Sequence, residues 1–116
     1  MKLEVGQFAR LKSGYICKII NINDFREPNM KYGVEANYLK DVMFIGDDDV
    51  VKASYNIIDI LEIGDYVNGG QVREIKKGYI RISGGKSLWE YLDNLKDIKS
   101  IVTHEQMEQI AYKVEE

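Results

Sequence analysis

Alternating apolar and polar residues predict two short β-strands at the start of the chain, from Gln7 to Leu11 and from Tyr15 to Ile22. Between them, Lys12-Ser13-Gly14 favours a tight turn, because glycine accepts the positive φ that such a turn needs. The next segment, Asn23 to Gly33, is mostly polar and contains the single proline, Pro28. We therefore expect a β-hairpin followed by a loop.

The same pattern predicts a second hairpin. Its strands would run from Val42 to Ile45 and from Val50 to Ser54, joined across the acidic turn Gly46-Asp47-Asp48-Asp49. The most apolar segment of the chain follows, from Ile57 to Ile63, and it predicts a buried connecting strand or turn.

The strongest hairpin signal lies in the second half of the chain. Tyr66-Val67 and Gln71 to Ile75 flank Asn68-Gly69-Gly70, and an Asn-Gly pair between β-rich segments is typical of a two-residue turn. A further turn at Lys76-Lys77-Gly78 leads into an alternating strand from Tyr79 to Ile82. This part of the chain therefore predicts short strands joined by tight turns.

From Ser87 the periodicity changes to that of a helix. Ser87 and Glu90 have the spacing of a capping box, in which each side chain accepts a hydrogen bond from an N–H group at the helix start. The apolar residues of the predicted helix share one face, formed by Leu88, Trp89, Leu92 and Leu95.

Three short elements are expected at the end of the chain. Ile98 to Val102 predicts a strand, and Thr103 with Gln106 predicts a second capping box that opens a short helix. A final strand is expected from Ala111 to Val114.

One short pattern occurs twice. Glu4-Val5-Gly6-Gln7-Phe8 and Glu62-Ile63-Gly64-Asp65-Tyr66 both read Glu, apolar, Gly, polar, aromatic. A second match relates Lys12 to Ile19 with Lys76 to Ile82, since both contain Gly-Tyr-Ile. Gene duplication and independent reuse of one structural solution both explain such a repeat.

Two of these segments resemble a known kind of fold. Lys12 to Ile16 and Ile63 to Val67 are similar to the opening strands of SH3-like and KOW-type small barrels. The resemblance implies a β-rich α+β fold: an SH3-like small barrel with one amphipathic helix and a short C-terminal helix. We expect residues 1–61 to form an N-terminal β lobe and residues 62–116 a C-terminal β lobe with the helices, the two sharing one core.

Composition and charge narrow the class of protein. With 116 residues, a net charge of −3 and a pI near 5.2, the chain lacks the broad basic face on which nucleic-acid coating depends. No apolar segment is long enough to span a bilayer and no signal peptide is recognisable, so we expect a cytoplasmic protein without a membrane partner. The only cysteine, Cys17, falls within a predicted strand and is expected to be a buried, inert thiol.

No set of residues predicts catalysis. His104 is the only histidine, which excludes multi-histidine metal sites, and we expect it to be exposed at the first turn of the last helix. Asp47-Asp48-Asp49 lacks the alternating spacing of a calcium loop. Gly84-Gly85-Lys86-Ser87 ends like a P-loop, but Ile80 stands where the first glycine of that motif belongs. We therefore predict a protein that is not an enzyme and uses neither a metal nor another cofactor.

Two groups of residues are candidates for ligand binding. An arginine with nearby tyrosines could stack on a base and contact phosphate, and glycines with a lysine before a helix could hold an anion. The predicted ligand-binding residues are Arg26, Tyr32 and Tyr38 in the first group and Gly84, Gly85 and Lys86 in the second.

A second resemblance bears on origin and function. Lys52 to Gly69 and Ile98 to Gln106 are similar to segments of small uncharacterised proteins of phages and prophages of Gram-positive bacteria. The resemblance implies an accessory protein that acts against host defence in the host cytoplasm. The leading hypothesis is a homo-oligomer that sequesters a nucleotide signal of host immunity.

Two alternatives stay open at this point. One is an inhibitor that docks on a host nuclease or effector, with the acidic segment Asp47 to Asp49 facing a basic groove. The other is a KOW-like nucleic-acid adaptor, which the overall charge disfavours. Its phosphate contacts would be Lys12, Lys18, Lys76, Lys77 and Arg81.

Overall fold

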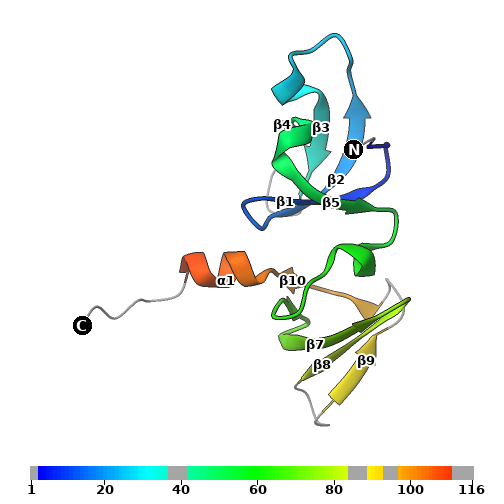
Figure 1. Ribbon diagram of the computed structural model, residues 1–116, viewed down its shortest axis with the longest axis vertical. Helices are drawn as coiled ribbons and strands as arrows, with labels where there is room; N and C mark the ends of the chain where they lie inside the picture. Colours follow the sequence, from blue (N-terminus) through cyan, green and yellow to red (C-terminus); the bar gives the residue numbers. More distant parts are fainter. Residues whose placement is uncertain (1–2, 37–41, 84–88, 93–96, 111–116) are drawn as a thin grey trace, which may run out of the picture. The chain divides into compact units, whose positions relative to one another are not determined.

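The computed structural model describes residues 3–36, 42–83, 89–92 and 97–110 (Figure 1). These residues form β-strands, short 3-10 helices and one short α-helix, so the β-rich fold is confirmed. The chain divides into two compact units, Met1–Ile60 and Leu61–Glu116, named unit 1 and unit 2. The division lies within one residue of the boundary expected between residues 61 and 62.

Unit 1 contains a five-stranded antiparallel sheet in the order β4-β3-β2-β1-β5. The last strand therefore returns to pair with the first, on the side of β1 opposite to β2. The elements of unit 1 are β1 (Phe8–Leu11), β2 (Ile16–Ile22), η1 (Pro28–Met30), β3 (Tyr32–Glu35), β4 (Met43–Ile45), η2 (Asp47–Asp49), β5 (Val50–Ser54) and η3 (Ile57–Ile60). The expected β1–β2 hairpin is confirmed, and Gly14 in its turn has a φ of 94°.

The second predicted hairpin of unit 1 is wrong. Both of its strands exist as β4 and β5, but β4 pairs with β3 and β5 pairs with β1. The acidic segment between them forms the 3-10 helix η2, in which the Asp49 N–H donates to the Gly46 carbonyl at 3.1 Å. A 3-10 turn does not reverse the chain as a two-residue hairpin turn does, so β5 continues to β1.

Unit 2 also contains a five-stranded antiparallel sheet, in the order β10-β6-β7-β8-β9. Its elements are β6 (Tyr66–Val67), β7 (Gly70–Lys76), β8 (Tyr79–Ser83), β9 (Trp89–Leu92), β10 (Ile101–Val102) and α1 (His104–Ile110). The Asn-Gly hairpin is confirmed, because β6 pairs with β7 and both Asn68 (φ 53°) and Gly69 (φ 83°) adopt the left-handed conformation.

The amphipathic helix predicted from Ser87 is wrong over Trp89–Leu92, which form strand β9. This strand pairs with β8, with Ser83 opposite Trp89 and Ile80 opposite Leu92. Four residues are too few for periodicity alone to separate helix from strand, and pairing with β8 decides the conformation. Ser87, Leu88 and Leu95 lie outside the described residues, as does the predicted strand Ala111–Val114.

The last predicted helix is confirmed as α1, together with its capping box. The Thr103 N–H donates to Gln106 Oε1 at 3.0 Å, and the Gln106 N–H donates to Thr103 Oγ1 at 3.3 Å. Two N–H groups that the helix itself leaves without partners are thereby satisfied.

The two sheets have the same topology, with β1 to β5 matched by β6 to β10 in order. The Gly6 N–H donates to the Ile19 carbonyl at 2.8 Å, and the Gly64 N–H donates to the Val72 carbonyl at 3.0 Å. In return Ile19 and Val72 donate to the residue that follows each glycine. The first half of the sequence repeat therefore marks equivalent positions in the two units.

The second half of the sequence repeat does not mark equivalent positions. Gly14 lies in the turn from β1 to β2, whereas Gly78 lies between β7 and β8, which match β2 and β3. The counterpart of the Gly14 turn in unit 2 is Asn68-Gly69. In unit 1 the counterpart of the short Gly78 turn is the longer connection of residues 23–31 between β2 and β3.

Each unit has buried apolar residues of its own. The core cluster of unit 1 consists of Leu3, Ala9, Leu11, Cys17, Ile19, Tyr32, Val34, Ala36, Ile45 and Val50. In unit 2 the buried apolar residues include Leu61, Val67, Val72, Ile80 and Ile82. That the two lobes share one core stays a prediction.

Candidate functional site

A tight turn at the start of unit 2 places one glutamate beside helix α1. Gly64, with a φ of 98°, allows the chain to turn from Glu62 into Asp65, whose N–H donates to the Glu62 carbonyl at 3.1 Å. Asp65 is fully buried, and its Oδ2 accepts the Glu62 N–H at 2.7 Å while its Oδ1 accepts the His104 N–H at 3.0 Å. One carboxylate therefore fixes the backbone of both Glu62 and His104.

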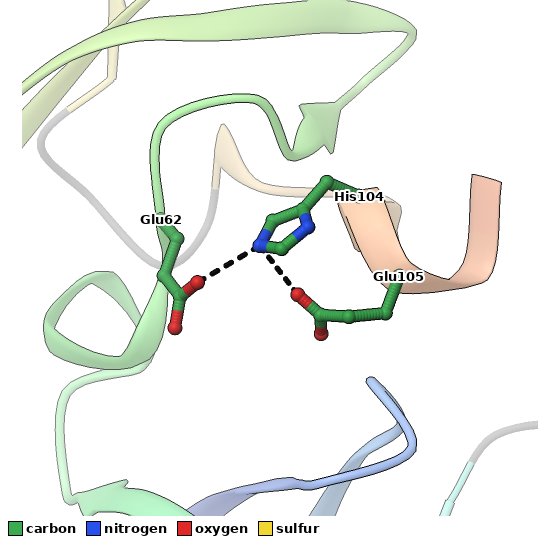
Figure 2. A group of neighbouring side chains, drawn as sticks. All are labelled: Glu62, His104 and Glu105. Atoms are coloured by element: carbon green, nitrogen blue, oxygen red, sulfur yellow. Dashed lines mark hydrogen bonds and ion pairs between the residues drawn. The ribbon is translucent and has the colours of Figure 1, made fainter. Parts of the chain in front are cut away.

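Three side chains converge at this point (Figure 2). His104 Nε2 lies 2.8 Å from Glu62 Oε1 and also contacts Glu105 Oε1. One ligand atom from each residue lies within 4.8 Å of the other two. The side chains of His104, Glu62 and Glu105 are 42%, 30% and 26% exposed, so the group is open to solvent on one side.

The expectation for His104 is therefore only half right. The residue begins helix α1 after the Thr103 cap, as predicted, but its ring is held between two carboxylates. Glu105 follows it directly in the sequence, whereas Glu62 is 42 positions away, so no local spacing could have indicated the group.

The same turn in unit 1 carries different side chains. The Glu4 N–H donates to Gln7 Oε1 at 2.9 Å, as the Glu62 N–H does to Asp65. Here Tyr55 lies over the glycine, because a Cβ atom added to Gly6 would be 3.4 Å from its ring. The Tyr55 hydroxyl donates to Glu4 Oε2 at 2.5 Å, and this hydrogen bond raises the pKa of the tyrosine.

Two of the predicted ligand residues are described, and they do not form one ligand-stacking pair. The guanidinium of Arg26 lies 3.9 Å from the centroid of the Phe44 ring. Tyr32 is only 2% exposed and its hydroxyl donates to Asp47 Oδ1 at 2.7 Å, so its ring cannot stack on a base without leaving the core. Burial, followed by the hydrogen bond to Asp47, raises the pKa of Tyr32. The other predicted ligand residues, Tyr38, Gly84, Gly85 and Lys86, lie outside the described residues.

Residues 23–31, the Phe25 loop, present an aromatic side chain that the sequence did not single out. The ring of Phe25 is 100% exposed. Two hydrogen bonds within the loop fix its backbone. Asn23 Oδ1 accepts the Phe25 N–H at 2.9 Å, and the Asn23 N–H donates to the Lys31 carbonyl at 2.9 Å. Phe25 therefore projects from a loop whose base is closed by hydrogen bonds.

Two residues of the acidic segment Asp47 to Asp49 accept hydrogen bonds from nearby groups. Asp47 accepts the hydroxyl of Tyr32, and Asp49 Oδ2 accepts the Gly46 N–H at 2.9 Å. All three aspartates are exposed. Their carboxylates are thus divided between local hydrogen bonds and solvent.

Three of the five basic residues proposed as phosphate contacts have acidic or aromatic neighbours. Arg81 and Lys76 lie 3.2 and 3.7 Å from the carboxylate of Glu74, and Lys18 lies 5.8 Å from the centroid of the Phe8 ring. Neutralisation by Glu74 weakens the attraction of this group for phosphate.

Cys17 is the buried, inert thiol that the sequence predicts. It is 3% exposed, and burial raises its pKa to about 11. Its Sγ lies 3.7 Å from the Ala9 carbonyl oxygen. A thiol of this kind is protonated at neutral pH and is no nucleophile.

The comparisons with known proteins add no family to this description. No protein-family model, curated protein or solved structure matches the chain. Within the described residues, no helix has both the length and the apolar character needed to cross a membrane.

Proposed function

We propose that this chain is a non-enzymatic binding protein that acts by occupying a partner protein, and that its contact surface is the Phe25 loop. We further propose that each unit is an SH3-like small barrel. The pairing of β1 with both β2 and β5 supports this proposal, as does the equivalent pairing of β6 with β7 and β10. Small barrels of this class bind their ligands through the loops that connect the strands.

The exposure of Phe25 is the observation that carries the proposal. A fully exposed phenyl ring forgoes roughly 1.5–3 kcal/mol that burial of such a side chain contributes. Aromatic side chains are frequent anchors of protein interfaces, where they fill a pocket on the partner. Met30, in the same loop, is 41% exposed and would widen the apolar contact.

The charges of the Phe25 loop favour a protein partner over a phosphate-bearing ligand. Lys31 pairs with Asp24 at 3.2 Å, and Glu27 adds a negative charge opposite to that of Arg26. The loop therefore has no net positive charge with which to attract phosphate. Under the phage resemblance, the partner would be a defence protein of the host.

Affinity capture with matched variants tests this proposal. The wild-type chain, Phe25→Ser and the control Val51→Thr are each used to capture proteins from a lysate of a Gram-positive bacterium, the host that the phage resemblance implies. Val51 is 44% exposed on β5, outside the loop. We expect one protein that wild type and Val51→Thr retain equally and that Phe25→Ser retains at least about tenfold less, as for an interface anchor. Equal retention by all three chains would refute the role of the loop.

A nucleotide signal of host immunity is the second candidate ligand, and Arg26 favours it. Among the described residues no acceptor is hydrogen-bonded to its guanidinium, whose central carbon lies 3.9 Å from the centroid of the Phe44 ring. Such a guanidinium can bind a phosphate by two parallel hydrogen bonds. Calorimetry with cyclic and ADP-ribose-type nucleotides would detect binding that Arg26→Gln weakens, and its absence at millimolar concentrations would remove this candidate.

A further inference from the structure

Three side chains of unit 2 place one possible metal-ligand atom each within 4.8 Å of the other two. We propose that Glu62, His104 and Glu105 bind one divalent ion of the zinc class, with an imidazole nitrogen and two carboxylate oxygens as ligands. The proposal is independent of the Phe25 loop, which belongs to unit 1.

The chemistry of the three side chains selects the ion. Imidazole nitrogen and carboxylate oxygen are both ligands of Zn²⁺, and imidazole also suits copper, iron and nickel. Mg²⁺ and Ca²⁺ prefer ligand sets made of oxygen alone. The two carboxylates together carry a charge that one divalent cation neutralises. The imidazole therefore favours a zinc-class ion over Mg²⁺.

A cation at this point would contact three ligand atoms that already face one another. Nε2 of His104 carries at most one hydrogen, yet Glu62 and Glu105 each place an oxygen against it. Two carboxylates that share so small a space also repel each other. An ion between the three ligand atoms would bind to all of them and remove this repulsion.

His104 and Glu62 would have to move little to bind an ion. Bonds of about 2.0–2.1 Å at tetrahedral angles place neighbouring ligand atoms roughly 3.3 Å apart. His104 Nε2 and Glu62 Oε1 are 2.8 Å apart, so they would separate by only about half an ångström around the ion. Both side chains are partly exposed and can rotate by this amount. Three protein ligands leave a fourth position for water or for another ligand.

The backbone already holds two of the three ligands in place. The buried carboxylate of Asp65 accepts the N–H groups of both Glu62 and His104, at 2.7 and 3.0 Å. Asp65 is thus a positioning residue, since it lies behind the ligands and contributes no atom to the cluster. Such support limits how much side-chain and backbone freedom must be lost when the ion binds.

The fold itself does not require this cluster, as unit 1 shows. The equivalent turn also carries a glutamate, Glu4, but its partner there is the Tyr55 hydroxyl. A neutral phenol with one glutamate is a poor site for a zinc-class ion. Glu4 therefore provides a matched control for Glu62 within the same chain.

The single histidine makes the test direct. The full chain, free of any histidine tag, is labelled with ¹⁵N and titrated with ZnSO₄, while the ring nitrogens of His104 are followed by NMR and the stoichiometry by calorimetry. We expect a shift of the Nε2 resonance that saturates at one zinc per chain. An equal concentration of MgSO₄ should leave the resonance in place.

Three variants distinguish zinc binding at this cluster from zinc binding elsewhere on the chain. Glu62→Gln and Glu105→Gln should each weaken zinc binding at least about tenfold, while Glu4→Gln leaves it unchanged. The amide spectrum of each variant establishes that it is folded, and Glu105→Gln decides the matter if Glu62→Gln does not fold. The proposal is overturned if the ring resonances do not move at one equivalent of zinc. Zinc bound only at Asp47 to Asp49 would give this result. The proposal is equally overturned if the folded glutamine variants bind zinc as tightly as wild type.

Discussion

Asp65 shows how one buried carboxylate can organise the start of a unit. It is 0% exposed and accepts hydrogen bonds from the backbone N–H groups of Glu62 and His104. Hydrogen bonds to a charged acceptor contribute more to stability than bonds between neutral groups, and a buried N–H left without its acceptor is destabilising. The turn and the helix should both depend on this side chain.

We expect Asp65→Ala to lower the free energy of unfolding by about 3 kcal/mol, because two partly buried N–H groups lose their charged acceptor. Gln7→Ala is the matched control, since Gln7 occupies the same place in unit 1 and accepts only the exposed Glu4 N–H. It should lower stability by less than about 1 kcal/mol. Chemical denaturation of the two variants measures both values, and equal losses would contradict the role given to Asp65.

Cys17 gives a second prediction at this scale. Its pKa of about 11, against 9.0 for an unburied thiol, leaves about a hundredfold less thiolate at pH 8. A disulfide reagent should therefore react at least about a hundredfold more slowly with the folded chain than with the chain in denaturant. Because the folded pKa is the higher one, the folded state should also lose stability as pH rises from about 9 towards 11. Rapid reaction of the folded chain at pH 8 would contradict the burial of this residue.

Residues with local signals could be predicted from the sequence, and those with distant partners could not. Cys17 was predicted to be buried from the alternation around it, and the Thr103–Gln106 cap from a spacing of three residues. Tyr32 donates a hydrogen bond to Asp47, 15 positions away, and His104 contacts Glu62, 42 positions away. Only the fold brings such pairs together.

Among the elements, strands with a strong turn between them were predicted reliably. The Asn68-Gly69 turn demands positive φ at two residues and so fixes β6 against β7. The segment Trp89–Leu92 has no such turn beside it, and its apolar spacing fits a helix as well as an edge strand. The pairing of β4 and β5 with other strands likewise depends on the 3-10 helix between them, which the sequence did not indicate.

Gly46 links two elements of unit 1 and tests their packing. A Cβ atom at this position would lie 2.4 Å from the Pro28 carbonyl oxygen and 2.7 Å from Asn29 Cα, both in the backbone of η1. Gly46→Ala should therefore displace η1, shift the amide resonances of the Phe25 loop and destabilise unit 1 by about 1–3 kcal/mol. Gly78→Ala is the control, because no atom lies within 4 Å of its added Cβ. Any loss of stability in this variant comes only from the φ of 88° at this position. Unchanged loop resonances in Gly46→Ala would contradict this packing.

At the scale of the whole molecule, the chain consists of two units with the same strand order. The repeated Glu-apolar-Gly motif predicted this likeness, and the glycines Gly6 and Gly64 form the same backbone hydrogen bonds in the two units. The repeated Gly-Tyr-Ile motif did not mark equivalent positions, because such a short segment fits any tight turn that leads into a strand. The proposed binding surfaces differ between the units, because Phe25, His104 and Glu105 lie outside the repeated motif and only Glu62 belongs to it.

The buried apolar cluster of unit 1 contains residues of that unit, which predicts that unit 1 folds on its own. The core cluster of unit 1 lies within residues 3–50, and the Arg10 guanidinium donates to the Ile60 carbonyl at 3.2 Å within the same unit. A fragment of residues 1–60 should therefore give a dispersed amide NMR spectrum and unfold cooperatively, with the marginal stability usual for so short a chain. An unfolded fragment, combined with a single unfolding transition of the full chain, would instead support one core shared by both lobes.

The proposed function rests on direct contact between the Phe25 loop and a partner protein, and site-specific photocrosslinking in living cells measures that contact. Benzoylphenylalanine is placed at position 25 of the full chain and, as a control, at position 63, where Ile63 is 65% exposed in unit 2. We predict one crosslinked species of higher mass from position 25 and none from position 63. Absence of a crosslink at position 25, or the same products from both positions, would contradict the account.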